Sequence, residues 1–178
     1  MAIEINNLTD NQDHESSTTQ GDLLQLRVWL RLLTCTTMIG RQIRGRLRQG
    51  FATTLSRYDA LAQLERAPDG LTMGQLSRRM MVSNGNVTGV VDCLVEEGFA
   101  ERVAVPGDRR ASFVRMTQRG REEFNKITPV HHSWIREMFH DMDRGDLDRL
   151  LNILGDLKSS ILNSLEKQSK TAIRRQSR

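Results

Sequence analysis

Long apolar runs are missing from this sequence. It has no stretch of about 18 consecutive apolar residues, the length that indicates a membrane-spanning helix. The first residues also lack the basic and then apolar pattern of a secretion signal. We therefore expect a cytoplasmic protein with no membrane partner.

Cysteine is scarce as well, since Cys35 and Cys93 are the only two in 178 residues. Both lie within apolar patterns of helical spacing. In a reducing compartment such cysteines are usually small buried hydrophobic residues. We therefore expect both side chains to be buried.

The patterns typical of catalysis are also missing. The sequence has no glycine-rich phosphate loop, no metal-binding motif and no spacing typical of a nucleophile and its base. His131 and His132, with His140 and Asp141 downstream, hint at a metal site, but adjacent histidines on a helix point to different faces. We expect a protein that is not an enzyme and has no cofactor. A metal-responsive regulator is kept as an alternative.

The charge is distributed unevenly along the chain. The formal net charge is +4, a modest basic excess that is consistent with nucleic-acid binding. Residues 1–22 carry acidic side chains but no Lys or Arg, whereas residues 169–178 carry Lys and Arg but no acidic side chains. Polar ends of one charge sign are usually disordered. We predict a disordered acidic leader over 1–22 and a disordered basic tail over 169–178.

The central stretch predicts two helices joined by a tight turn. Thr72 is placed to cap the first helix, with Gln75 three residues later as in a capping box. Ser83 is placed to cap the second helix, and Gly98 to end it. The buried face of the second helix is predicted from helical spacing to hold Val87, Val90, Val91, Leu94 and Val95. Its other face carries the short polar side chains of Asn84, Asn86 and Thr88, which can reach base edges.

A hairpin is predicted directly after these helices. Residues 99–105 largely alternate between apolar and polar, residues 106–110 have turn chemistry, and residues 111–116 return as a second strand. Arg109 and Arg110 lie at the tip, where a basic hairpin can enter a minor groove. The alternative is a solvated turn. The order of elements predicts a winged helix-turn-helix DNA-binding domain over 51–117, in a mainly α-helical fold with a small β-hairpin wing.

Long helices are predicted on both sides of this domain. Apolar residues recur at alternating steps of three and four through 23–50 and again in the last part of 118–168. Gly50 is expected to end the first helix, Pro129 to kink the penultimate one, and Asp143 or Asp146 to begin the last. The apolar seams predict a helical dimerisation region built from both chain ends. An intramolecular pairing of the first and last helices is the alternative, and both arrangements can hold together.

Five segments of the chain resemble the MarR family of transcriptional regulators. They are residues 71–77, 83–88, 94–99, 108–111 and 116–120, of which the Asp-Arg-Arg wing and the Thr-x-x-Gly helix start are the most specific. The resemblance covers about residues 25–165. It implies a homodimeric winged helix-turn-helix protein that binds double-stranded DNA, represses genes, and often releases DNA when a small phenolic or aromatic acid binds. One departure is the polar, glycine-bearing segment at 84–86, where relatives often carry a bulkier or basic residue.

This resemblance assigns roles to the DNA-facing residues. Asn84, Asn86 and Thr88 would contact base edges, and Ser83 would cap its helix and touch a phosphate. The family pattern Asp-x-Arg falls on Asp108 and Arg110. Arg109 and Arg110 would therefore enter the minor groove, with Asp108 orienting Arg110. A pseudo-palindromic operator with half-sites about 10 base pairs apart follows from the dimer.

The resemblance also predicts an effector site between the dimerisation helices and the winged domain. Arginine beside aromatic walls suits a (hydroxy)benzoate-like carboxylate. The residues with this chemistry are Trp29, Arg31, Arg57, Tyr58 and His131. Two alternatives stay open: a redox response through Cys35, and a winged-helix protein-interaction module that does not recognise specific DNA.

Overall fold

The computed structural model describes residues 23–105 and 108–176 of the chain, and the side chains of 105–111 and 171–176 lie outside this description. The chain divides between Trp134 and Ile135 into two compact units. The predicted leader over 1–22 lies outside the described residues. None of the described helices is long and apolar enough to cross a bilayer.

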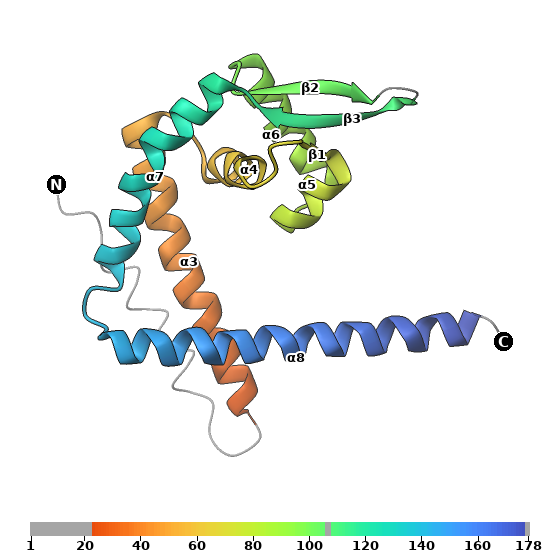
Figure 1. Cartoon of the computed structure of the whole chain (residues 1–178). Helices are drawn as coiled ribbons and strands as arrows, with labels where there is room; N and C mark the ends of the chain where they lie inside the picture. The colour runs from red at the N-terminus through yellow and green to blue at the C-terminus, as the bar shows by residue number, and fades with distance from the viewer. Residues whose placement is uncertain (1–22, 106–107, 177–178) are drawn as a thin grey trace. The chain divides into compact units, whose positions relative to one another are not determined.

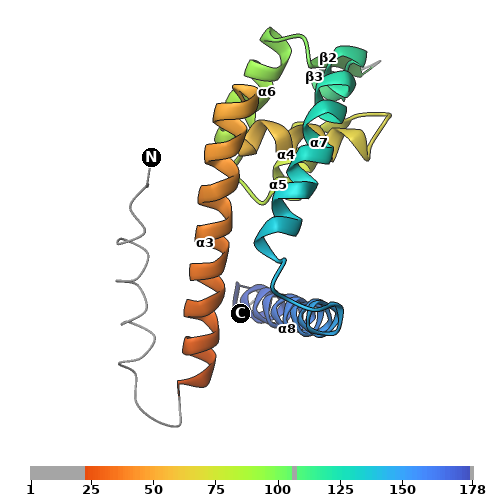
Figure 2. The same ribbon diagram turned by 90° about the vertical axis from the view of Figure 1, so that its left-hand side faces the viewer.

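The first unit begins with a single long helix, α3 (Leu24–Phe51), which is continuous in both views (Figure 1 and Figure 2). The prediction that Gly50 ends this helix is wrong by one residue, because the helix ends at Phe51. Ala52 instead takes the left-handed conformation, with φ 49°, and its backbone N–H donates to the carbonyl of Leu47. This hydrogen bond closes the last turn of the helix one residue past its end.

Side-chain caps begin the three helices that follow, and the caps predicted at Thr72 and Ser83 are confirmed. α4 (Leu55–Glu65) is capped by Thr54, and α5 (Met73–Met80) has the complete capping box, in which the Thr72 N–H donates to Gln75 Oε1 at 2.8 Å. α6 (Asn84–Glu96) is capped by Ser83. Gly98 takes the left-handed conformation that ends its last turn, with φ 73°.

The wing is part of a three-stranded antiparallel sheet. β2 (Ala100–Val105) pairs with β3 (Asp108–Met116), and β3 also pairs with β1 (Leu71–Thr72), giving the order β1-β3-β2. Figure 1 shows β2 and β3 running next to each other as a hairpin. Only the hairpin was predicted, because a strand of two residues is too short to produce an alternating pattern. β1 joins the start of α5 to the base of the wing.

One apolar core holds α4, α5, α6 and the sheet together. The predicted inward face of α6 is confirmed for Val87, Val91 and Leu94, which are fully buried, while Val90 and Val95 are partly buried against the same core. The core also includes the following buried residues: Leu61, Leu64, Leu71, Leu76 and Val114. Burial of this face leaves the opposite side of the first turns of α6 in solvent.

α7 (Gln118–Met138) starts in the first unit and continues across the boundary between the units. Thr117 begins it: its hydroxyl oxygen accepts from the Gly120 N–H at 3.0 Å and donates to the Gly98 carbonyl at 2.7 Å. The first bond caps α7, and the second attaches its start to Gly98, just past the end of α6. Pro129 lies inside α7 without ending it.

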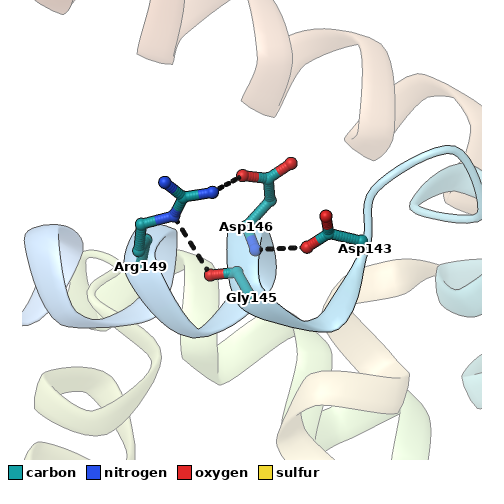
Figure 3. A network of polar contacts seen from close by, with 4 residues as sticks. All are labelled: Asp143, Gly145, Asp146 and Arg149. Atoms are coloured by element: carbon teal, nitrogen blue, oxygen red, sulfur yellow. Dashed lines mark hydrogen bonds and ion pairs between the residues drawn. The ribbon is translucent and has the colours of Figure 1, made fainter.

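The second unit contains α8 (Arg144–Gln176), which Asp143 begins. Figure 3 shows the Asp143 carboxylate accepting from the Asp146 N–H, at 2.7 Å, while Arg149 pairs with Asp146 and donates to the Gly145 carbonyl. α8 continues to Gln176, past residue 168 where we expected a disordered tail to follow. Lys170 lies one turn after Glu166, with its Nζ 4.0 Å from Glu166 Oε2. Ion pairs at i,i+4 spacing stabilise a helix.

Candidate nucleic-acid interface

The polar residues predicted to contact bases lie together on the first turns of α6. Ser83, Asn84, Asn86 and Thr88 are all exposed, whereas Val87 between them is buried. The Ser83 hydroxyl accepts from the Asn86 N–H at 3.4 Å. The Thr88 hydroxyl donates to the Asn84 carbonyl at 2.9 Å, so it faces its own helix as well as solvent. The structure therefore presents an exposed polar turn at the positive end of a helix dipole.

Two glycines leave open space on this surface. A Cβ added at Gly85 or Gly89 would meet no atom within 4 Å, so neither glycine is required for packing inside the chain. A glycine surface without intramolecular contacts allows another backbone to approach closely. The departure at 84–86 thus fits a helix start that lies against a large ligand.

Replacing Ser83 with alanine is expected to lower the free energy of unfolding by about 1 kcal/mol, because the cap of α6 loses its acceptor. Urea denaturation of the variant measures this change. Ser83→Thr serves as the control, because threonine keeps the hydroxyl oxygen and should retain most of the stability. An alanine variant as stable as the wild type would show that the cap contributes nothing.

Basic side chains next to this turn were missed in the sequence analysis. Arg78 and Arg79 are exposed in the last turn of α5, directly before the turn that leads into α6. Met81 in that turn is 87% exposed and has a φ of 55°, an uncommon conformation for a residue with a side chain. The adjacent arginines were the available signal, since a basic pair at a helix end beside the predicted turn suits contact with phosphates.

The wing is attached to α6 by an ion pair. Arg102 on β2 lies 2.7 Å from the Asp92 carboxylate on α6. The backbone of Asp108, Arg109 and Arg110 begins β3, after an irregular register between Ala104 and Val105. Their side chains lie outside the described residues, so their predicted DNA contacts stay predictions.

Two of the predicted effector residues lie together in an aromatic cluster, which consists of Phe51, Tyr58, Phe124, His131 and Trp134. Tyr58, which is 6% exposed, stacks on Phe124 at 5.5 Å and lies 4.7 Å from the His131 ring, measured between centroids. Trp134 lies 6.1 Å from Phe51 and 6.5 Å from His131. The cluster joins the end of α3 to α4 and α7 within the first unit.

Three polar features belong to this cluster. The Arg46 guanidinium lies 5.9 Å from the centre of the Trp134 ring, within the range of a cation–π contact. His131 Nδ1 is buried and makes no hydrogen bond. The Tyr58 hydroxyl and the Thr128 hydroxyl are 3.3 Å apart. An unpartnered ring nitrogen among aromatic rings is a position where a polar group of a ligand could bind.

The other predicted effector residues lie elsewhere. Trp29 is 56% exposed and precedes Arg46 by 17 residues, so it lies about 26 Å along α3 from the cluster. Arg31 follows Trp29 on the same part of α3. Arg57 pairs with Glu97 at 2.7 Å. The structure therefore brings Tyr58 and His131 together but separates Trp29 and Arg31 from them, and it gives Arg57 a protein carboxylate as partner.

His131 should make stability depend on pH. Burial, and secondarily the charge of neighbouring His132, lowers the pKa of His131 below its usual value. At this histidine the unfolded chain binds a proton at a higher pH than the folded chain does. The free energy of unfolding is therefore at its full value above about pH 6.5, and it falls as the pH drops from there toward the lowered pKa. The loss of unfolding free energy between pH 7.5 and 5.5 should be smaller in His131→Gln, as measured by urea denaturation. Equal losses in both proteins would contradict this origin.

The prediction that Cys35 is buried is wrong, because its side chain is exposed, whereas Cys93 is partly buried. Cys35 lies on α3 between Leu33 and Met38, which are also exposed. The apolar spacing there marks a face that the first unit does not bury. Among residues 23–105 and 108–176, no group of three or more His, Cys, Asp or Glu could hold a metal ion.

Comparison with known proteins finds relatives of the winged region. Residues 53–111 match the family model described as the MarR family. The chain is 34% identical over 80 residues to the uncharacterised HTH-type transcriptional regulator YkoM of Bacillus subtilis, covering 45% of this chain and 52% of YkoM. It is 26% identical over 109 residues to the HTH-type transcriptional regulator PecS of Dickeya dadantii, covering 60% and 66%. The matched segments thus span between half and two thirds of these two relatives.

A longer match to a curated relative and two solved structures extend the comparison. The transcriptional activatory protein BadR of Rhodopseudomonas palustris is 29% identical over 139 residues, covering 74% of this chain and 79% of BadR. The transcriptional regulator BldR of Sulfolobus solfataricus superposes with a TM-score of 0.71 at 21% identity, covering 80% and 99%. Sco3205 of Streptomyces coelicolor, a MarR family regulator solved in complex with DNA, gives 0.70 at 20% identity, covering 80% and 90%. The winged-helix fold is therefore confirmed.

Proposed function

We propose that this chain, whose winged helix-turn-helix domain is of the MarR family, is a sequence-specific DNA-binding transcriptional regulator. The observation that supports this most directly is the exposed polar turn at the start of α6, with the two exposed arginines of α5 beside it. A helix start of this kind fits a major groove, and the arginines fit the flanking phosphates. The fold shared with Sco3205, which was solved with DNA, supports the same function.

In this proposal sequence is recognised by a few side chains. Asn84 and Asn86 would pair with adenine through their amides, while Thr88 would contact a neighbouring base edge. Ser83 would place the start of α6 against a phosphate. Arg109 and Arg110 would reach the minor groove from the wing, with Asp108 holding Arg110 in position.

We propose a homodimer, because both chain ends expose apolar side chains at helical spacing. The exposed large apolar residues of α3 are Leu24, Leu26, Val28, Trp29, Leu33 and Met38, and those of α8 are Leu151, Ile153, Leu154, Ile161, Leu162 and Leu165. Such patches mark interaction surfaces. A two-fold dimer would place two α6 helices about one DNA turn apart. Sedimentation should give twice the monomer mass, and footprinting should show two half-sites about 10 base pairs apart.

We propose that DNA binding represses transcription and that a small aromatic carboxylate, such as a (hydroxy)benzoate, reverses it. The aromatic rings of Tyr58 and Trp134 would enclose the effector ring, and His131 Nδ1 would hydrogen-bond to its hydroxyl or carboxylate. Arg46 beside Trp134 would supply positive charge. An effector acts only if it binds the two arrangements of the protein with different affinities.

A panel of benzoates and hydroxybenzoates, added to the protein on promoter DNA, tests the effector class. One acid should release the DNA, and Tyr58→Ala should raise the concentration required. A reporter gene separates repression from activation, which matters because BadR is named an activatory protein. DNA binding that none of these acids reverses would support the proposed regulator but contradict the proposed class of effector.

A further inference from the structure

Three ion pairs among the described residues connect α4, α6, α7 and β2. Arg121 of α7 lies 3.5 Å from Glu65 of α4, Arg57 of α4 lies 2.7 Å from Glu97 at the end of α6, and Arg102 of β2 lies 2.7 Å from Asp92 of α6. The Arg57–Glu97 pair is the least exposed of the three, with side chains 20% and 37% exposed. Partly buried ion pairs are screened by salt less than exposed ones. This pair is therefore the strongest candidate for holding α6 in place.

The two charges of this pair lie at the unfavourable ends of their helices. Arg57 is in the first turn of α4, where a helix dipole favours acids, and that turn has no acidic residue. Glu97 is the C-terminal cap of α6, where the dipole favours bases, and the last turn has no basic residue. Neither charge stabilises the helix in which it lies. Each charge is stabilised by the other across the gap between α4 and α6.

Arg57 is also the sequence neighbour of the central residue of the aromatic cluster. Tyr58 is buried against Phe124 and His131, so its position on α4 follows the packing of α7. One helix, α4, therefore holds the cluster through Tyr58 and the end of α6 through Arg57. A rigid helix with a contact at each site can bias both.

We infer that Arg57 is a positioning residue that fixes the end of the recognition helix to α4 and thereby couples the aromatic cluster to DNA binding. This inference rests on the proposed DNA-binding function, and it assigns Arg57 a role other than binding an effector. When the cluster changes its packing, α4 moves, and Glu97 follows the guanidinium. By reciprocity, DNA held on α6 changes the environment of the cluster.

Exchanging the two charges tests the coupling. Arg57→Gln, Glu97→Gln and the double exchange Arg57→Glu with Glu97→Arg would be compared in promoter-DNA titrations. Each single variant should weaken binding by about 2- to 30-fold, the range for residues that modulate the coupling between two sites, and the exchange should recover most of it. The exchanged charges also match both helix dipoles, so the double variant should fold. Lys126→Gln, which breaks only the exposed Lys126–Glu123 pair within α7, is the matched control and should change nothing.

A fluorescence readout separates coupling from a merely structural role. The chain has two tryptophans, so in a Trp29→Phe background Trp134 alone reports on the cluster. Saturating promoter DNA should shift its emission, and Arg57→Gln should remove most of the shift even when the DNA site is saturated. The charge exchange should restore it. A full shift in Arg57→Gln, or an exchange no better than either single variant, would overturn the inference.

Amide hydrogen exchange tests the positioning without DNA. Arg57→Gln should speed exchange in the last turns of α6, over 91–98, and the charge exchange should slow it again. If the wild type showed no sequence preference for DNA, the proposed function would fail while this measurement still decided the role of Arg57. Unchanged protection of 91–98 in Arg57→Gln would refute that role by itself.

Discussion

Replacing Arg110 with alanine is expected to weaken operator binding by about 1–3 kcal/mol, or roughly 5- to 150-fold. An arginine in a narrow minor groove is attracted by the enhanced negative potential there, and alanine loses both the charge and the hydrogen bonds. The strand pairing of β3 with β1 and β2 supports the base of the wing from both sides. The loss should depend on the sequence of the flanking DNA as well as on salt.

Arg109→Ala and Asp108→Asn are the comparisons for this prediction. If Arg109 contacts only phosphate, Arg109→Ala should weaken binding to all sequences alike. It should also reduce the slope of log affinity against log salt by about 1. Asp108→Asn should have a smaller effect, because it alters the orientation of Arg110 but leaves its charge. Unchanged affinity of Arg110→Ala at physiological salt would remove the wing from the DNA interface.

Replacing Gly120 with alanine is expected to lower the free energy of unfolding by about 3 kcal/mol or more, as overpacking against backbone does. A Cβ at this position would lie 2.0 Å from the carbonyl oxygen of Phe99 and 3.1 Å from Met116 Cγ. The Phe99 carbonyl also accepts from the Thr117 N–H at 3.1 Å. The collision would therefore disturb the joint where α6, the wing and α7 meet.

Gly155→Ala is the matched control for this prediction. Gly155 lies inside α8, and a Cβ there would meet nothing within 4 Å. Alanine at such a position should stabilise the helix by about 0.5–1 kcal/mol. Urea denaturation of both variants compares the two effects. A Gly120→Ala protein as stable as the wild type would mean that the start of α7 moves freely away from Phe99.

Much of the winged domain could be predicted from the sequence because local chemistry determines it. At a helix start the hydroxyls of Thr72 and Ser83 accept a hydrogen bond from a free backbone N–H, which caps the helix. Gly98 takes the left-handed conformation, which few other residues adopt. The buried face of α6 follows from its spacing. β1 was missed because its two residues are defined by their pairing with Val114 and Phe113, which are far away in the sequence.

The effector residues were harder to predict, because their grouping depends on tertiary packing. Composition suggested Trp29, but the tryptophan that packs beside His131 is Trp134. Arg57 has the charge that a carboxylate requires, yet its partner Glu97 lies 40 residues away and could not be identified from either helix alone. The side chains at the proposed DNA surface were easier to predict. The apolar spacing of α6 identifies its buried face, so the polar residues on its opposite face are predicted to be exposed.

A fluorescence-anisotropy titration with the promoter DNA upstream of its own gene tests the central claim most directly. It would compare that DNA with a scrambled duplex of equal length and composition at several salt concentrations. Our account predicts tighter binding to the promoter at every salt concentration, with log affinity falling linearly in log salt by about 0.9 for each phosphate contacted. Equal affinity for both duplexes throughout would contradict sequence-specific DNA binding and favour a winged-helix protein-interaction module.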